Sequence, residues 1–490
     1  MTEAEKCAMG ERGFMKYRRQ EAEYRDPRTR VRDFNAVEIP LNEADLRRQA
    51  ARCMECGTPF CHGHGCPLGN IIPELNLLVH GGWWNEAVDL LRSTNPFPEF
   101  TSRVCPAICE ASCVLNLNDQ PVAIRQIEMA IIEQGFKSGY LAPMPPKTRR
   151  SGKLAVIGSG PAGLAVADAV NRAGYGVTVF EKDRRGGGIL RYGIPDFKLE
   201  KWVLDRRLRL MEAEGIGFKL GVTGGEEVSV DFLRKHFDAI CLTGGAREPR
   251  DLKTPGRELR GIRFAMEYLV QQNRLLTGEI EKIDPELDAK GKEVVIIGGG
   301  DTGADCLGTA LRQGASRVLQ FEIMSRPPDT RPASTPWPMW PNIRRESSSH
   351  KEGGERRWSV NTREFIGRDG AVSGLRGVEV EWAAGPDGRQ KFREMPGTEF
   401  EVEARLVLLA MGFAGPGRNR MADDLKLELD ARGNIRVDDN HMTSHEGIFA
   451  AGDMARGQSL VVRAIADGRD AAMGITEYLR HKKTIQNRLG

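Results

Sequence analysis

The sequence predicts an α/β protein in which a helical N-terminal domain precedes two nested domains of alternating strands and helices. Three observations support this prediction. A glycine-rich turn between a strand and a helix begins at Gly158, the same pattern returns at Gly298, and residues 1–147 show helical periodicity without the alternation typical of strands. The 490 residues suffice for about three domains of roughly 100–200 residues each.

Composition argues against several classes of protein. Lys and Arg number 71 against 68 Asp and Glu, and the net charge of +3 provides no strong field for nucleic acid or an anionic membrane. The longest apolar stretches, such as 406–414, are too short to span a bilayer, and residues 1–11 lack a signal-peptide core. We therefore expect a cytoplasmic protein that binds neither nucleic acid nor a membrane.

The N-terminal domain should consist of helices joined by loops. Helical spacing of apolar residues predicts helices over 43–52, 71–79, 84–91 and 124–134. The basic, proline-rich segment 142–150 has few side chains that could pack in a core, so we interpret it as a linker.

Seven of the ten cysteines lie in this domain. Such crowding in a chain without a secretion signal indicates metal binding rather than disulfides. The first group is C-x2-C-x4-C-x4-C-P and the second is C-P-x2-C-x3-C. Their members are Cys53, Cys56, Cys61 and Cys66, then Cys105, Cys109 and Cys113.

Two iron–sulfur clusters explain seven cysteines better than zinc does. One tetrahedral zinc site would leave three cysteines unused, unless His62 and His64 helped to form a second site. Cubane clusters take four ligands each, and in two-cluster ferredoxins a cysteine before proline ligates the other cluster, a position that Cys66 and Cys105 share. We expect two 4Fe-4S clusters with crossed ligation and an eighth ligand that is not cysteine.

The first glycine turn has the spacing of a dinucleotide site. Gly158, Gly160 and Gly163 would provide a tight turn, close approach of a pyrophosphate to the helix N-terminus, and packing of helix on strand. Glu181 follows Gly158 by 23 residues and ends the next strand, where a carboxylate can accept from a ribose hydroxyl.

A second turn near the C-terminus, Gly452-Asp453, follows a strand and precedes a helix expected from about Ser459. In two-dinucleotide flavoproteins of the glutathione-reductase type, which this arrangement resembles, the equivalent aspartate contacts the flavin. The outer fold is therefore expected to hold FAD, with its sequence split around an inserted domain.

The inserted turn should bind a nicotinamide dinucleotide. Glu322 ends the second strand, 24 residues after Gly298, and favours the free 2′-hydroxyl of NADH. Arg326 could instead accommodate the 2′-phosphate of NADPH, so the choice stays open. The turn residues concerned are Gly298, Gly300, Asp301, Thr302 and Gly303.

The domain boundaries follow from these motifs. We expect an FAD domain over 148–247 and 406–490 and an NAD(P)H domain over 248–405. Within the latter, six prolines fall between Pro327 and Pro341, which predicts a long loop without regular structure.

FAD is the element that would join the other cofactors. A nicotinamide gives two electrons as hydride and a cubane accepts one at a time, so a flavin must convert between them. No catalytic acid, base or nucleophile is then needed. Cys241 and Cys306 are isolated, which excludes a disulfide reductase, and we expect both in the core.

Several longer motifs resemble the small (β) subunit of glutamate synthase over essentially the whole chain. They are CMECGTPFC, GCPLGN, VCPAICEASC, GGGILRYGIPDFKLEK and GGGDTGADC. The N-terminal half of dihydropyrimidine dehydrogenase shares this architecture. The resemblance implies one cluster on Cys53, Cys56, Cys61 and Cys105, and another on Cys66, Cys109, Cys113 and Glu128.

The resemblance also implies flavin contacts. The segment 186–198 should lie over the flavin, and Thr243-Gly244 should form a crossing between the two dinucleotide domains. The further positions expected to contact cofactor are Pro161, Ala162, Lys182, Gly188, Leu190 and Arg191.

By the same resemblance, this chain would oxidise NAD(P)H and pass electrons to a large (α) subunit that makes L-glutamate from 2-oxoglutarate and L-glutamine. An alternative is an electron-transfer module for a different acceptor, such as ferredoxin. A third hypothesis is a zinc-bearing flavoprotein scaffold that binds partners without turnover.

Overall fold

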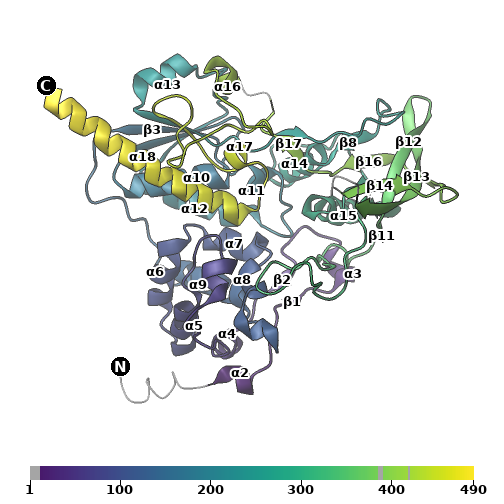
Figure 1. Ribbon diagram of the computed structural model, residues 1–490, viewed down its shortest axis with the longest axis horizontal. Coiled ribbons are helices and arrows are strands. Elements are labelled where there is room, and N and C mark those ends of the chain that lie inside the picture. The colour runs from purple at the N-terminus through teal and green to yellow at the C-terminus, as the bar shows by residue number, and fades with distance from the viewer. Residues whose placement is uncertain (1–11, 385–389, 418–419, 490) are drawn as a thin grey trace.

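The computed structural model describes residues 12–384, 390–417 and 420–489, with side chains to residue 482. The N-terminal helices lie below the first of two parallel sheets, and the second sheet lies to one side (Figure 1). Among the described residues, no helix combines the length and apolar character needed to cross a membrane.

The N-terminal domain is helical, as predicted. Its apolar core includes Ile72, Leu75 and Val79, which repeat at helical spacing on one helix. The longer helices are α4 (Glu43–Ala50), α5 (Ile72–Gly81), α6 (Trp84–Thr94), α7 (Pro98–Val104) and α9 (Ile124–Lys137). Shorter elements are α2 (Gly13–Lys16), α3 (Pro27–Arg30), the π-helix η1 (Cys61–Gly65), α8 (Ile108–Ala111) and the 3-10 helix η2 (Val114–Leu117).

Two features of this domain were not predicted. Helix α7 starts with a proline, which suits the first turn of a helix, but seven residues give too little periodicity to detect. The strands β1 (Glu23–Tyr24) and β2 (Glu38–Ile39) form a two-residue antiparallel pair, which is too short to produce an alternating pattern.

The first sheet is parallel, in the order β18-β6-β3-β4-β5. The glycine turns at Gly158 and Gly452 each follow a strand of this sheet, as predicted. Its strands are β3 (Lys153–Ile157), β4 (Gly176–Glu181), β5 (Gly217–Leu220), β6 (Ala239–Leu242) and β18 (Ile448–Ala450). The accompanying helices are α10 (Pro161–Arg172), α11 (Ile189–Tyr192), α12 (Lys201–Ala213), α13 (Val230–His236), α16 (Arg420–Asp424), α17 (Asp453–Arg456) and α18 (Val461–Leu489).

The second sheet is also parallel, in the order β8-β16-β9-β10-β11. Its strands are β8 (Ile262–Phe264), β9 (Glu293–Ile297), β10 (Arg317–Phe321), β11 (Glu355–Arg357) and β16 (Leu406–Leu409), with helices α14 (Ala265–Leu276) and α15 (Asp301–Gln313). The internal repeat therefore covers four strands of each sheet, whereas the edge strand β8 precedes its four and β18 follows its four in the chain.

The expected domain boundary at residue 406 is wrong by one strand. β16 pairs with β9 and β8, so it belongs to the second sheet and not to the FAD domain. Four consecutive buried apolar residues suit the centre of either parallel sheet, so the sequence did not distinguish them. The chain leaves the second sheet domain through β17 (Phe413–Gly415), which pairs with β7 (Glu248–Pro249), the strand near which the chain entered that domain.

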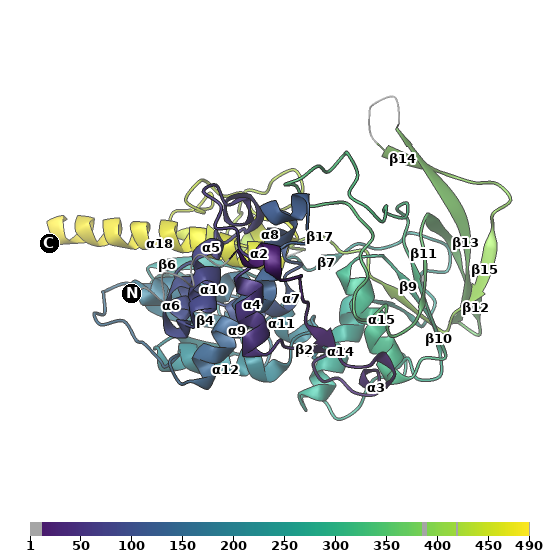
Figure 2. The same cartoon turned by 90° about the horizontal axis from the view of Figure 1, so that it is seen from below.

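An antiparallel sheet projects from the second domain. It consists of β12 (Val360–Arg368), β13 (Ala371–Ala384), β14 (Gln390–Glu394) and β15 (Phe400–Glu403). The β13–β14 ribbon extends away from the body of the molecule, opposite the end of α18 (Figure 2). The proline-rich segment 327–341 contains no helix or strand, as predicted.

Buried ion pairs join the domains. Arg207 on α12 donates to Glu99 on α7 at 2.5 Å and 3.1 Å, and both side chains are 0% exposed. At the other side, Glu352 accepts from Arg30 at 2.6 Å and from Arg312 at 2.5 Å. The N-terminal domain is thus fastened to both sheet domains by charges that water does not reach.

Breaking the Glu99–Arg207 pair should loosen the first of these junctions. We expect Glu99→Leu to lower the free energy of unfolding by about 3–5 kcal/mol, because the Arg207 guanidinium then stays buried without its partner. The double variant Glu99→Leu/Arg207→Met should recover most of that loss. Calorimetric melting temperatures would contradict the expectation if the single and double variants unfolded together.

Candidate functional site

The seven clustered cysteines and Glu128 line two separate cavities in the N-terminal domain. The outer cavity contains one set of four, and the inner cavity contains the other. Lining the outer cavity are Cys53, Cys56, Cys61 and Cys113. Lining the inner cavity are Cys66, Cys105, Cys109 and Glu128.

This grouping corrects the expected one, in which Cys105 and Cys113 were exchanged. Helix α8 is a single turn, entered through Ala107 in the left-handed conformation (φ 62°), with Cys105 before it and Cys113 after it. The turn places Cys105 and Cys109 on the inner cavity and sends Cys113 to the outer one. Spacing alone could not show this, because the direction of so short a helix depends on what packs against it.

The electrostatics agree with the grouping. Burial raises the pKa of Cys53 to about 11 and of Cys61 to about 12, and the charge of Cys113 adds to both effects. Burial likewise raises the pKa of Cys66 to about 12, here with Glu128 as the next contributor. Ionised thiols in these cavities therefore need a positive group to compensate their charge.

Glu128 fits the role of eighth ligand. Its carboxyl is buried on α9, and burial raises its pKa to about 7. Asn70 Nδ2 donates to Glu128 Oε1 at 2.8 Å and fixes the side chain toward the inner cavity. Two sets of four donors suit two cubane clusters, one set of four thiols and one of three thiols and a carboxylate.

The two histidines do not fit a metal site. Neither His62 nor His64 lines either cavity within the described residues, and both lie on the π-helix η1. In the described part of the chain, no three His, Cys, Asp or Glu side chains converge as they would around a single ion. The ligands of a cubane stand at its separate corners instead.

A glycine brings the two cysteine loops together. A Cβ on Gly65 would lie 2.7 Å from Cys109 Cα, so the turn between Cys61 and Cys66 packs directly on α8. Any larger residue at position 65 would push η1 away from α8. The outer and inner cavities would then move apart as well.

The first glycine turn is closed from behind by Thr243. Gly158 has φ 109°, and a Cβ there would lie 2.6 Å from Thr243 O; a Cβ on Gly163 would lie 2.6 Å from Thr243 Oγ1. Glu181 is buried and accepts from Ser159 N at 2.9 Å and Asp183 N at 3.0 Å. The strand-end carboxylate therefore stands beside the turn, as predicted.

The other expected flavin residues gather at the same turn. A Cβ on Gly188 would lie 2.9 Å from Gly160 Cα, and one on Gly452 would lie 2.7 Å from Ala162 Cβ. Pro161 and Ala162 open α10 behind Gly160, and Thr243 and Gly244 follow β6. Segments 158–163, 186–191, 243–244 and 452–459 thus form one site at the carboxyl ends of the strands.

Leu190 and Arg191 are buried in the segment that covers the turn. Arg191 Nε donates to Gly186 O at 2.6 Å and the same guanidinium pairs with Asp205, so this side chain holds the segment's shape. Lys182 directly follows Glu181, and burial lowers its pKa.

Asp453 lies in the C-terminal turn. Ser459 Oγ donates to Asp453 Oδ1 at 2.9 Å, while Gly452 N donates to Asp467 Oδ2 at 2.6 Å. Burial raises the pKa of Asp453 to about 6, and the neighbouring Asp467 adds to the shift.

The second glycine turn repeats the first. A Cβ on Gly298 would lie 2.3 Å from Ala410 O, and one on Gly303 would lie 2.2 Å from Gly298 O. Gly300 caps α15, and Asp301 and Thr302 form its first turn. Glu322 accepts from Gly299 N at 2.8 Å and from Met324 N at 2.9 Å, which places its carboxylate at the turn.

Arg326 lies beyond Glu322 in the described loop. It pairs with Asp329 at 3.0 Å in an exposed position, and its guanidinium carbon is 6.0 Å from the centre of the Trp358 ring. Arg356 stands 5.0 Å from the same ring. Sequence reasoning did not find Trp358 or Arg356, because they lie about 30 residues farther along the chain, at and just after β11.

The proline-rich loop also reaches the outer cavity, a contact that the sequence did not reveal. Trp337 Nε1 donates to Cys113 O at 3.2 Å, and its ring centre lies 4.7 Å from that of Phe60. Ser112 Oγ donates to Pro338 O at 2.8 Å. The second sheet domain therefore packs against residues that line or adjoin the outer cavity, including Cys113.

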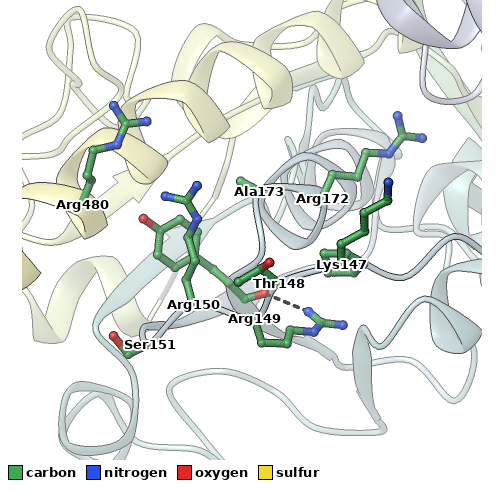
Figure 3. A pocket seen from close by; sticks show the side chains of 10 residues that line it. Lys147, Thr148, Arg149, Arg150, Ser151, Arg172, Ala173 and Arg480 are labelled. Atoms are coloured by element: carbon green, nitrogen blue, oxygen red, sulfur yellow. Dashed lines mark hydrogen bonds between the residues drawn. The ribbon is translucent and has the colours of Figure 1, made fainter.

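A large basic pocket of about 640 Å³ lies elsewhere, between the linker and the first sheet domain (Figure 3). It adjoins the amino ends of the strands, away from both glycine turns. Arg149 donates to Asn171 Oδ1 at 2.7 Å and to Glu214 O at 2.9 Å, so this linker cation docks the linker on the domain.

Comparisons with known proteins agree with this geometry. Residues 152–468 match the pyridine nucleotide-disulphide oxidoreductase family, and residues 30–140 match dihydropyrimidine dehydrogenase domain II, 4Fe-4S cluster. The glutamate synthase (NADPH) small chain of Mycobacterium tuberculosis is 53% identical over 95% of each chain. The chain belongs to the glutamate synthase small chain family. It is accordingly an oxidoreductase.

Other relatives extend the comparison. The small chain of Bacillus subtilis is 42% identical over 95% of this chain and 98% of its own. Glutamate synthase (NADH) of Saccharomyces cerevisiae is 45% identical over 96% of this chain but only 22% of its own length. In yeast, the equivalent of this small chain is part of a much longer polypeptide.

A solved structure supports the two-sheet fold. FprA from Mycobacterium tuberculosis aligns with a TM-score of 0.54 and 20% identity, over 68% of this chain and 86% of that one. Cys241 and Cys306 are fully buried in the small chain, as predicted for core residues.

Asp453 provides a test of the flavin site through pH. The pKa of Asp453 is higher in the folded protein than in the unfolded chain, so the folded state binds the proton more tightly. The folded protein should therefore lose stability as the pH rises from about 4 to about 6. We expect Asp453→Asn, freed of FAD, to be more stable than wild type by about 1–2 kcal/mol at pH 7 and equal to it near pH 4. The variant should also bind FAD more weakly.

Melting temperature against pH for both FAD-free proteins measures this. Ser459→Ala is the control, since removing a donor to the ionised carboxylate should destabilise the protein at pH 7. If the stability difference between Asp453→Asn and wild type did not change with pH, the raised pKa of Asp453 would be contradicted.

Proposed function

We propose that this chain is the electron-input subunit of glutamate synthase. It oxidises NADPH and passes electrons through FAD and two 4Fe-4S clusters to a large subunit, which converts 2-oxoglutarate and L-glutamine into L-glutamate. The observation that carries the proposal is the presence, in one chain, of two dinucleotide turns and two four-ligand cavities, one of which is built against the FAD domain. When bound, the flavin would accept hydride and release single electrons.

The order of the cavities supports a direction of electron flow. The inner cavity is lined by Val462, in the first turn of α18, which follows the Asp453 turn. Arg469 on α18 also donates to the carbonyl oxygens of Leu68 and Thr94, which fixes the N-terminal domain on this helix. The inner site therefore stands between the flavin site and the outer cavity, whose lining includes Met54, 40% exposed.

The chain's own residues would do the positioning. Glu181 and Glu322 stand where a ribose hydroxyl can donate to each, and the helix N-termini at Gly160 and Gly300 face the pyrophosphates. The segment 186–191 packs on the turn through Gly188 and would cover one side of the bound flavin. No side chain is required as acid or base, because the hydride would pass directly between the two cofactors when both are bound.

Paired cysteine variants test the order. We expect Cys109→Ala to retain FAD reduction by NADPH and to lose reduction of either cluster, because it removes an inner ligand. Cys56→Ala should allow FAD and the inner cluster to be reduced but deliver nothing to the large subunit. Anaerobic titration followed by optical and EPR spectroscopy measures each step. Reduction of the outer cluster in Cys109→Ala with the inner cluster missing would refute the proposed order.

A variant of Arg326 tests whether NADPH is the electron donor. Its exposed pair with Asp329 is weak enough for a 2′-phosphate to replace, and Arg356 stands at the same ring. We expect Arg326→Ala to lower kcat/KM for NADPH by about tenfold, or about 1.4 kcal/mol, and to leave the value for NADH unchanged. Equal values for NADPH in the variant and the wild type would remove Arg326 from phosphate recognition.

A further inference from the structure

One polar side chain in the outer cavity has no counterpart in the expected ligand set. Asn76 is 1% exposed, and among the residues that line the outer cavity it is the one polar side chain that is not cysteine. The remaining lining is apolar, from residues such as Phe60, Ile72 and Leu115. A carboxamide in such surroundings costs free energy unless it finds a hydrogen-bond partner.

Asn76 occupies a position on α5 where packing favours an apolar residue. Ile72, Leu75 and Val79 form the buried stripe of this helix, and residue 76 falls within the same stripe at the spacing i, i+3, i+4, i+7. The helix N-terminus begins at Ile72, so residue 76 is already in the helix interior, where it has no capping role.

Neither polar atom of the Asn76 side chain has a hydrogen-bond partner of ordinary geometry among the described residues. The asparagines of the inner cavity differ. Asn70 donates to Glu128 Oε1 at 2.8 Å and accepts from Thr94 Oγ1 at 2.9 Å, and Asn95 donates to Thr101 Oγ1 at 2.8 Å and accepts from Phe97 N at 3.0 Å. Both inner asparagines are thus used by the protein itself.

Asn76 and Cys53 line the same cavity, and the nearby Asn76 side chain acts to lower the pKa of the Cys53 thiol against the larger effect of burial. The cavity presents only sulfur atoms and apolar groups to it, and thiolate and sulfide sulfur accept hydrogen bonds but do not donate them. The NH2 group, and not the carbonyl oxygen, must therefore face the cavity.

We propose that Asn76 donates an N–H hydrogen bond to the sulfur atoms of the outer cluster and thereby raises its reduction potential relative to an apolar cavity. The inference rests on the proposed function, because it takes the outer cavity to hold a 4Fe-4S cluster. Hydrogen bonds to sulfur are among the factors that set the potential of such clusters.

The physical reason is the change of charge on reduction. One electron, which the inner cluster supplies, adds one negative charge to the outer cluster, and no proton or bond needs to move. In a cavity lined by four thiolates and apolar side chains, the N–H dipole stabilises the reduced form more than the oxidised form. Asn76 therefore acts directly on the outer cluster and makes it a better acceptor for the electron that must leave the chain.

Redox titration of the full chain, purified anaerobically with both clusters and followed by EPR, tests this. We expect Asn76→Leu, which keeps the branching and the number of side-chain heavy atoms and removes the donor, to lower the midpoint potential of the outer cluster, so that the ratio of reduced to oxidised cluster at a fixed potential falls several-fold. The potentials of FAD and of the inner cluster should not change. Cys56→Ala identifies the outer signal, since it removes an outer ligand.

Asn76→Asp is the second variant, in case Asn76→Leu does not assemble its outer cluster. It keeps the shape and exchanges the donor for a negative charge, so it should lower the potential further. If either variant contains the outer cluster, with full iron content, at the wild-type potential, the inference about Asn76 is overturned and the proposed function is unaffected. A wild-type chain without an outer cluster would overturn the proposed function as well.

Discussion

The buried pairing of Glu99 with Arg207 is the interaction on which the working arrangement depends. It joins α7, which precedes Cys105, to α12, which follows the segment over the flavin turn. Since electron transfer falls steeply with distance, the inner cavity has to be held at a fixed separation from the flavin site. A charged pair that water does not reach resists sliding because either charge alone would be strongly disfavoured there.

Contacts between domains also support the outer cavity, which lies farther from the flavin site. The outer cavity is lined by the N-terminal domain but is supported from outside, because Trp337 from the second sheet domain donates to the carbonyl of Cys113. The buried Arg30–Glu352–Arg312 cluster fixes that domain to the N-terminal segment at another point. Each domain of the chain therefore helps to position cofactors that its neighbours bind, which suits a protein that moves electrons between them.

The two cavities also differ in chemistry. The inner one offers three thiols and a carboxylate, with asparagines whose hydrogen bonds stay within the protein. The outer one offers four thiols in an apolar lining and a single amide without a conventional partner. These environments stabilise negative charge to different extents, so two clusters bound as proposed would have different potentials even if they were of the same type.

The amino-acid sequence by itself determined the glycine turns, the strand-end carboxylates Glu181 and Glu322, the helical N-terminal domain and the two groups of cysteines, because each depends on local spacing. Glu128 was expected only from the resemblance to the family, because no spacing rule singles it out. Only the tertiary structure decided which cavity receives Cys105 and which receives Cys113, to which sheet β16 belongs, and that Trp337 and Asn76 meet the outer cavity. Those depend on the direction of a one-turn helix, on the pairing of a strand that is apolar on both faces, and on packing between segments more than 200 residues apart in the case of Trp337. Such contacts leave no periodic trace in a sequence.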